Sequence, residues 1–204
     1  MKTNIVAKKE DKAPLCLEIG NSLIPLVNER KKENLLDRIS RARKDPEVII
    51  PPVHIINNLQ LDGYEYCIKL NEVIIGRYKI KPDSFLCINP GEIEYEINGE
   101  ETKDPAFEFP AMWINTNDKE KAKQAGYTIV DPAGIISAHI KEICKRRAQD
   151  LLSMQVTKEM LEDCRKDHPF VVEEVLKCLS VSEVQRVLKN FLKENVSIRS
   201  LYNS

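Results

Sequence analysis

Glycine is scarce in this sequence, with seven among 204 residues. Loops that cradle phosphate groups are built on clustered glycines, and the chain contains none of the motifs G-x-x-x-x-G-K-[ST], G-x-G-x-x-G or G-x-S-x-G. The sequence therefore offers no support for a nucleotide-binding loop or for the nucleophile turn of a serine hydrolase.

Long apolar runs and an excess of one charge sign are also missing. No stretch approaches the roughly 18 consecutive apolar residues of a membrane span, and the first residues, MKTNIVAKKEDKAP, lack the apolar centre of a signal peptide. Lys and Arg number 31 against 32 Asp and Glu, which gives no general reason to expect nucleic acid or acidic lipid as a partner. The basic triplet at 145–147 is expected to be a solvated helix face. These features predict a cytoplasmic protein without a nucleic-acid partner.

Closely spaced cysteine pairs are absent. The six cysteines are Cys16, Cys67, Cys87, Cys144, Cys164 and Cys178, and no two form a C-x-x-C pair. Secreted disulfide frameworks and structural zinc sites need close or paired spacing. We therefore expect reduced thiols that pack as small apolar side chains.

Histidine is equally sparse, with only His54, His139 and His168. None of them belongs to a group of three or four convergent ligands, so we expect no metal and no cofactor. A nucleophilic cysteine activated by His54 or His139 stays open as a distant alternative, because such partners meet in space rather than in sequence. The residues by themselves favour a non-enzymatic binding protein over a cysteine-dependent hydrolase.

The composition that remains, 42% hydrophobic and 31% charged, is typical of a globular protein. Its length allows one large domain or two to three small ones. Alternating apolar residues predict strands over 15–19 and 64–70, and a polar turn at Asn71-Glu72 predicts a hairpin into the apolar run 73–75. The alternation over 93–97 predicts a further strand, with Asn98-Gly99 as a hairpin turn. Helical spacing predicts a helix over 32–44.

Further helices are expected after a short one at 118–125, which Gly126 should close. Asp131-Pro132 predicts a helix start, for a helix running to about residue 152. Thr157 is expected to cap the next helix, and Ser180 with Glu183 predicts a capping box for a helix through residue 192. The sequence thus predicts a mixed α/β region over 14–131 and helices over 132–195.

Several blocks occur in a recognisable order. They are LEIG at 17–20, LIPLV at 23–27, LLDRI at 35–39, PPVHI at 51–55, NLQL at 58–61, INPG at 88–91, TKDPAF at 102–107, GYTIVDP at 126–132, QRVLKNFL at 185–192 and VSIR at 196–199. This succession resembles the cytoplasmic portion of the export-gate family of type III secretion systems (FHIPEP), in its flagellar branch. The resemblance runs from about Pro14 to Arg199.

The resemblance implies a multi-lobed α+β fold. Residues 14–82 together with 132–151 would form a discontinuous, thioredoxin-like α/β lobe, and 83–131 an inserted ferredoxin-like lobe. A helical lobe would occupy 152–204 and would be incomplete. Residues 1–13 are expected to form a flexible linker.

The resemblance also implies a function. The family's cytoplasmic half is a docking platform for flagellar export chaperones with bound cargo, and works beside components of the export ATPase complex and other export-gate subunits. In the family it lies on the cytoplasmic side of the bacterial inner membrane and forms a ring of nine subunits. This chain lacks the family's last lobe, so by itself it is expected to be monomeric. The blocks at 58–61 and 88–91 favour the flagellar branch, and the export gate of a virulence secretion system remains an alternative.

Carried over position by position, the resemblance also implies a chaperone-binding surface. Its residues would be Ile88, Pro90, Asp104, Phe107, Phe109, Val130, Ile135 and Ala138. Apolar anchors there would supply desolvation, and Asp104 would orient a polar group of the partner. The family usually has Thr where this chain has Ala138, so one polar contact is expected to be lost.

Overall fold

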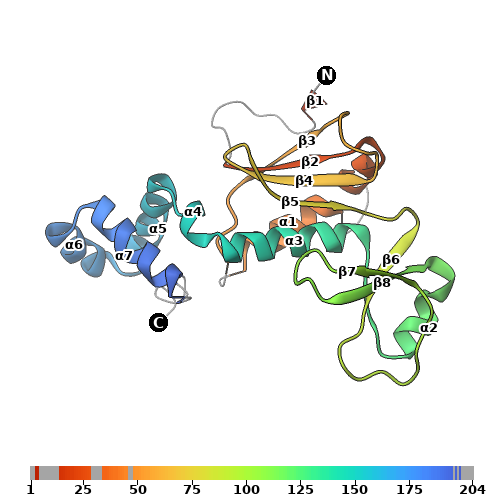
Figure 1. The fold of residues 1–204 in the computed structure, drawn as a ribbon. Helices are drawn as coiled ribbons and strands as arrows, with labels where there is room; N and C mark the ends of the chain where they lie inside the picture. The colour runs from red at the N-terminus through yellow and green to blue at the C-terminus, as the bar shows by residue number, and fades with distance from the viewer. Residues whose placement is uncertain are drawn as a thin grey trace. The chain divides into compact units, whose positions relative to one another are not determined.

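The chain folds into two compact units. A computed structural model describes residues 3–4, 14–28, 34–45, 48–194, 196 and 198. The first unit comprises residues 1–42 and 51–143, and the second comprises 43–50 and 144–204 (Figure 1). Of the linker predicted over 1–13, only the backbone of β1 (Thr3–Asn4) is described, and it pairs with β3 (Val53–Asn57); the rest lies outside the described residues.

A five-stranded mixed sheet organises the first unit. Besides β1 and β3 it contains β2 (Leu15–Ile19), β4 (Glu65–Leu70) and β5 (Val73–Lys79), in the order β1-β3-β2-β4-β5. β2 and β3 are parallel, because the chain crosses between them through the 3-10 helix η1 (Asn21–Val27) and α1 (Leu35–Arg43). The remaining strand pairs are antiparallel.

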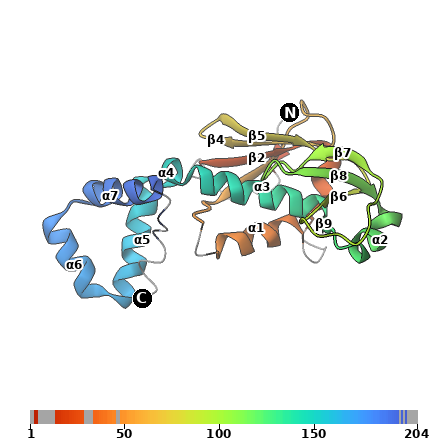
Figure 2. The ribbon, with the colours of Figure 1, turned by 60° about the horizontal axis from the view of Figure 1, so that its bottom comes forward.

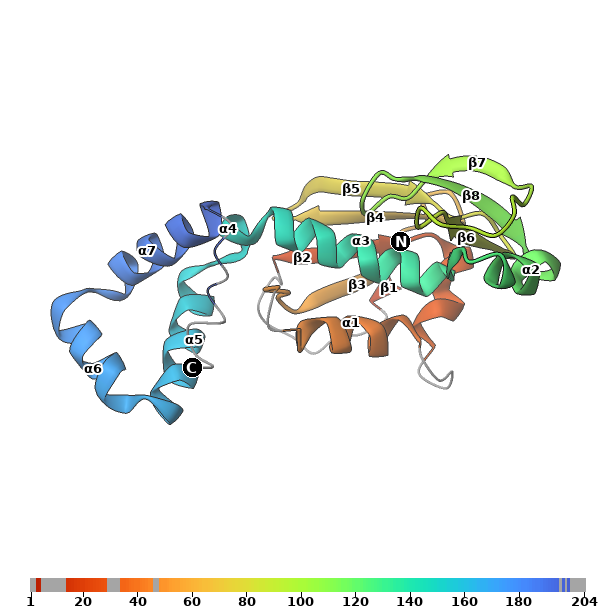
Figure 3. The same cartoon turned by 90° about the horizontal axis from the view of Figure 1, so that it is seen from below.

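Two helices cover one face of this sheet. Figures 2 and 3 show α1 and α3 (Pro132–Arg146) side by side on that face. α3 approaches closely because Gly76 in β5 has no side chain: a Cβ there would lie 2.5 Å from the Ile143 Cδ1. Leu17 of β2 and Ile136 of α3 are fully buried in this layer.

The hairpin predicted at Asn71-Glu72 is confirmed. It joins β4 to β5, and both turn residues have positive φ angles, 48° and 67°. Two consecutive left-handed residues give a turn whose twist matches that of the flanking strands. A non-glycine pair therefore provides the backbone twist that this tight connection needs.

The first unit also holds a four-stranded antiparallel sheet. Its strands are β6 (Ser84–Ile88), β7 (Glu100–Lys103), β8 (Pro110–Asn115) and β9 (Thr128–Val130), in the order β7-β8-β6-β9. Between β8 and β9 the chain forms the 3-10 helix η2 (Thr116–Asp118) and α2 (Lys119–Gln124). Gly126, with a φ of 92°, follows α2 and turns the chain into β9 as the sequence predicted.

The strand predicted over 93–97 is wrong, and so is the hairpin turn at Asn98-Gly99. Residues 93–97 form no strand; instead Ile93 and Ile97 pack against a core that contains Cys87 and Ile114. Ile93 and Ile97 are partly buried, whereas Tyr95 between them is 44% exposed, so the alternation does not mark one buried strand face. The hairpin of this sheet is β7–β8, closed by residues 104–109.

Residues 132–194 form helices joined by short connections, as predicted, but two helix boundaries differ. The helix expected to reach about residue 152 ends at Arg146, and α4 (Ala148–Leu151) follows Arg147. α5 (Met154–Asp167) is capped by Ser153, whose side chain accepts the Val156 N–H, and not by Thr157. Thr157 is fully buried and its hydroxyl donates to the Ser153 carbonyl.

α6 (Pro169–Cys178) and α7 (Val181–Lys193) complete the second unit. α7 begins with the predicted capping box, since Ser180 and Glu183 bond each other's backbone N–H groups. The core beneath these helices includes Leu152, Leu161, Val172, Val184 and Leu188. In the ranges that the structure describes, no helix has both the length and the apolar character that crossing a bilayer requires.

Candidate docking site

A tightly held loop of six residues, 104–109, connects β7 to β8. Asp104 closes it from one end: its N–H donates to the Phe109 carbonyl at 2.9 Å, and its carbonyl accepts the Glu108 N–H at 2.8 Å. Its carboxylate oxygen Oδ2 accepts the Phe107 N–H at 2.7 Å. Three hydrogen bonds to one residue therefore determine the shape of the 104–109 loop.

This loop presents two phenylalanines to solvent. Phe107 and Phe109 are 48% and 57% exposed, and their rings stack with centroids 5.9 Å apart and planes inclined by 20°. Glu108 between them has a φ of 60°, a left-handed conformation that is uncommon for a residue with a side chain. The strained residue, Glu108, is thus the one that joins the two phenylalanines whose rings stack.

The register of the second sheet brings Ile88 and Pro90 to the same end as this loop. Ile88 is paired with Ala111 in β8, next to Pro110, where the 104–109 loop rejoins the sheet. Ile88 is half-buried, and Pro90 lies exposed just beyond it. Together with the phenylalanine rings, these residues make this end of the sheet apolar.

The other predicted site residues lie at the start of α3. Val130 ends β9 and is half-buried, as is Ala138. Ile135 is 1% exposed and belongs to the core. Asp104 is also buried, at 4% exposure, and its carboxylate holds the 104–109 loop. Neither Ile135 nor Asp104 therefore presents its side chain to a partner in this conformation.

A side chain that the sequence did not indicate also contacts this region. The Tyr78 hydroxyl of β5 donates to the Lys103 carbonyl at 2.9 Å, immediately before the loop begins. The two residues are 25 positions apart and belong to different sheets. A local sequence pattern carries no signal for such a contact.

His139 and the cysteines Cys87 and Cys144 are buried. The Nδ1 of His139 lies 2.8 Å from the Tyr66 hydroxyl. Burial raises the pKa of Cys87 to about 11 and that of Cys144 to about 12, the opposite of what an activated nucleophile needs. The described residues contain no group of three His, Cys, Asp or Glu side chains able to hold a metal ion.

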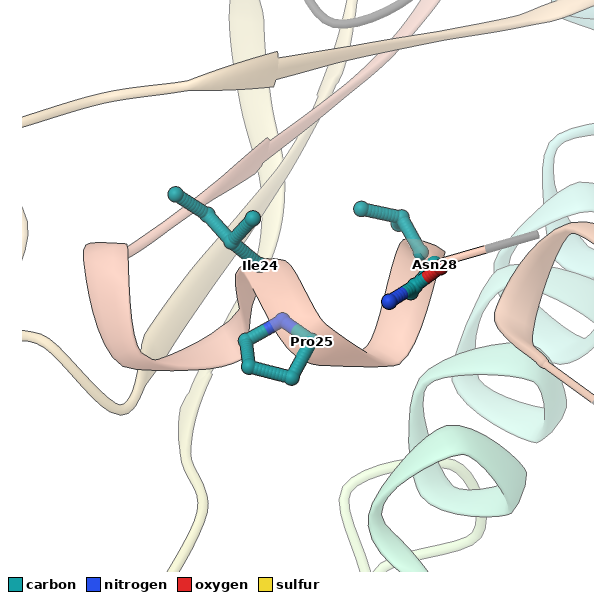
Figure 4. A pocket seen from close by; sticks show the side chains of 4 residues that line it. Ile24, Pro25 and Asn28 are labelled. Atoms are coloured by element: carbon teal, nitrogen blue, oxygen red, sulfur yellow. The ribbon is translucent and has the colours of Figure 1, made fainter. Parts of the chain in front are cut away.

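A shallow hollow of about 320 Å³ lies elsewhere, on η1. It is lined by Ile24, Pro25, Val27 and Asn28 (Figure 4). The lining is mostly aliphatic and offers no cluster of titratable groups. Its chemistry fits apolar contact and gives no basis for catalysis.

Comparison with known proteins gives a family match and a curated relative that agree with each other. The sequence profile of the FHIPEP family matches residues 2–203. The chain is 43% identical over 192 residues to "Flagellar biosynthesis protein FlhA" of Borreliella burgdorferi, which covers 92% of this chain and 27% of that protein. The chain therefore spans about a quarter of the length of this curated relative.

Solved structures share the fold. The CdsV protein of Chlamydia pneumoniae superposes with a TM-score of 0.78 at 25% identity, over 95% of this chain and 58% of that one. A nonameric SctV-C assembly from EPEC gives a TM-score of 0.68 at 15% identity, over 96% and 58% of the two chains. The second likeness bears on the fold alone.

Proposed function

This chain belongs to the FHIPEP family, and we propose that it serves as a docking platform of the flagellar type III protein export gate. In this role it binds export chaperones that carry their cargo, at the apolar end of the second sheet. The family comprises components of protein transport rather than enzymes. The raised thiol pKa values described above give no support to the alternative of a cysteine-dependent hydrolase.

One observation carries the proposal: the stacked, exposed pair Phe107–Phe109 on a loop that is rigidly held. Aromatic side chains that are solvent-exposed and ordered lose little conformational freedom when a partner covers them, so their desolvation contributes directly to affinity. Exposed Phe side chains contribute little to a core. The geometry therefore favours a docking role over a packing role for these two residues.

The flagellar branch is favoured over a virulence secretion system. The support for this branch is the 43% identity over 192 residues to a flagellar biosynthesis protein. We propose the export ATPase complex and the other gate subunits as further partners, and a ring of nine as the assembly of the full-length protein. The cytoplasmic side of the inner membrane is the proposed location.

The proposed lobes follow the topology of the two sheets. In the first sheet, the order β3-β2-β4-β5, with parallel β2 and β3 and an antiparallel β4–β5 hairpin, supports the proposal of a thioredoxin-like lobe over 14–82 and 132–151. In the second, the order β7-β8-β6-β9, with α2 before β9, supports the proposal of a ferredoxin-like lobe over 83–131. Its first helix is replaced by the irregular segment after Asn89. The helical lobe over 152–204 completes the proposal.

The test measures how tightly two single-residue variants, each with one phenylalanine side chain removed, bind a chaperone–cargo complex. Phe107→Ala and Phe109→Ala should each weaken binding of a purified flagellar chaperone–cargo complex by about 2 kcal/mol, roughly 30-fold, in titration calorimetry. Thermal unfolding should stay close to that of the parent, because both rings are already exposed.

Phe170→Ala is the matched control, because Phe170 is an exposed phenylalanine on α6, outside the proposed site (82% exposed). This variant should leave the affinity unchanged. If both loop variants bind like the parent, the chaperone docks elsewhere and the site assignment is wrong. A loss of equal size in the Phe170 variant would point to non-specific apolar association instead.

A further inference from the structure

Tyr78 links the two sheets of the first unit. It lies in β5, at the edge of the five-stranded sheet, yet its hydroxyl contacts two residues of β7. The hydroxyl donates its one hydrogen to the Lys103 carbonyl at 2.9 Å, so Thr102 Oγ1, 3.2 Å away, is the donor in the second contact. Lys103 directly precedes Asp104, the residue that closes the 104–109 loop.

The ring of Tyr78 is held on two sides. It stacks on Trp113 of β8 with centroids 6.2 Å apart, and it lies 6.4 Å from its cross-strand neighbour Tyr66. Tyr66 in turn meets His139 of α3 edge-on at 5.8 Å. Burial raises the pKa of Tyr78, so its hydroxyl keeps its hydrogen at neutral pH. The donor is therefore both ordered and protonated.

The strand that receives this bond is a short edge strand. Among the described strands, β7, which is four residues long, pairs with β8 alone, and its first residue, Glu100, forms an ion pair with Lys81. Short edge strands fray, and a frayed β7 would release the start of the 104–109 loop together with the Asp104 turn. The Tyr78–Lys103 bond holds β7 at the end from which the 104–109 loop leaves the strand.

We propose that Tyr78 is a positioning residue for the docking surface: its hydroxyl anchors the start of the 104–109 loop and so holds the Phe107–Phe109 pair in one geometry. The role of Tyr78 in docking rests on the proposed function. That the Tyr78 hydroxyl holds the 104–109 loop can be tested without any partner.

The experiment compares two tyrosine variants by amide hydrogen exchange and by calorimetry. Tyr78→Phe removes the hydroxyl and keeps the ring that stacks on Trp113. Tyr95→Phe is the matched control, because the Tyr95 hydroxyl also donates to a single backbone carbonyl, that of Lys121, at 3.0 Å in the same unit. Trp113 is the chain's single tryptophan, so its fluorescence reports whether the stacked core is intact.

In Tyr78→Phe we expect the amides of Phe107 and Glu108 to exchange about three- to tenfold faster, as the loss of one neutral hydrogen bond implies. Trp113 emission should be unchanged, and affinity for the chaperone–cargo complex should fall by a similar factor. Tyr95→Phe should change neither the exchange of these amides nor the affinity. Loop exchange equal to that of the parent in Tyr78→Phe would overturn the proposal, as would equal acceleration in both variants.

Failure of the proposed function gives a different pattern. If the parent chain does not bind the complex, the exchange measurement still decides whether Tyr78 holds the loop. If Phe107→Ala abolishes binding while Tyr78→Phe leaves exchange and affinity unchanged, only the positioning role is lost. Thr102→Val, which leaves the Lys103 bond in place, should have a smaller effect on exchange than Tyr78→Phe.

Discussion

Asp104 shows how burial changes the role of a single residue. The family resemblance implies that Asp104 orients a polar group of a docked partner. The structure buries its side chain and directs the carboxylate to the Phe107 N–H. Asp104 therefore acts through the loop that it holds.

We accordingly predict that Asp104→Ala lowers the free energy of unfolding by about 1–3 kcal/mol, since the Phe107 N–H loses its acceptor. The urea midpoint, measured with an unchanged m value, reports this loss. Asp104→Asn keeps an oxygen acceptor and should cost distinctly less. An Asp104→Ala variant as stable as the parent would mean that the carboxylate does not hold the loop.

At the scale of elements, local capping decided where several helices begin. Asp131 accepts the Gly134 N–H at 3.0 Å through Oδ1, as the Asp-Pro pattern predicted, and its Oδ2 also pairs with Arg38 of α1. For α5 the cap predicted at Thr157 is wrong: Ser153 caps the helix, and the Thr157 hydroxyl donates back to the Ser153 carbonyl while the side chain is buried.

The capping box of α7 supplies a stability prediction. Ser180→Ala should destabilise the second unit by about 1 kcal/mol, because the Glu183 N–H loses its side-chain acceptor. Thermal unfolding followed by far-ultraviolet circular dichroism measures the effect. Ser180→Thr keeps a hydroxyl that can accept the Glu183 N–H and donate to the Glu183 carboxylate, so it should unfold close to the parent. Equal destabilisation by Ala and Thr would contradict the capping role.

At the scale of the whole molecule, the buried thiols make the free energy of unfolding depend on pH in the alkaline range. The pKa of Cys87 is raised to about 11 and that of Cys144 to about 12, from an ordinary value of 9.0. In the unfolded chain these thiols ionise near pH 9, whereas in the folded chain they keep their protons. Since the folded state then binds more protons, its stability falls as pH rises.

We predict that the free energy of unfolding is insensitive to these thiols below about pH 8 and declines from about pH 9 toward pH 11. Denaturant titrations under reducing conditions at successive pH values test this. Cys144→Ala should flatten the decline, while Cys178→Ala, at an exposed position, should leave its slope as in the parent. A parent curve that is flat over this interval would show that the thiols ionise alike in both states.

Much of this protein follows from residues close together in sequence. The Asn71-Glu72 turn, the Gly126 helix end, the Asp131 cap and the Ser180 capping box each rest on hydrogen bonds or backbone angles within about four residues, so the sequence alone determined them. The strand prediction from the alternation at 93–97 failed because the segment does not bury one face: Ile93 and Ile97 are partly buried, and Tyr95 is exposed. The apolar character of the 104–109 segment was also visible in the sequence, but its exposure was not.

Only the tertiary structure decided which side chains are covered. It exposes Phe107 and Phe109 while burying Ile135, and it buries Glu18 with Lys69 and Asn58, residues 51 and 40 positions away. It likewise brings Tyr78 to Lys103 across two sheets. Such contacts depend on how separate elements pack, and packing is a property of surfaces that meet only when the whole unit has folded.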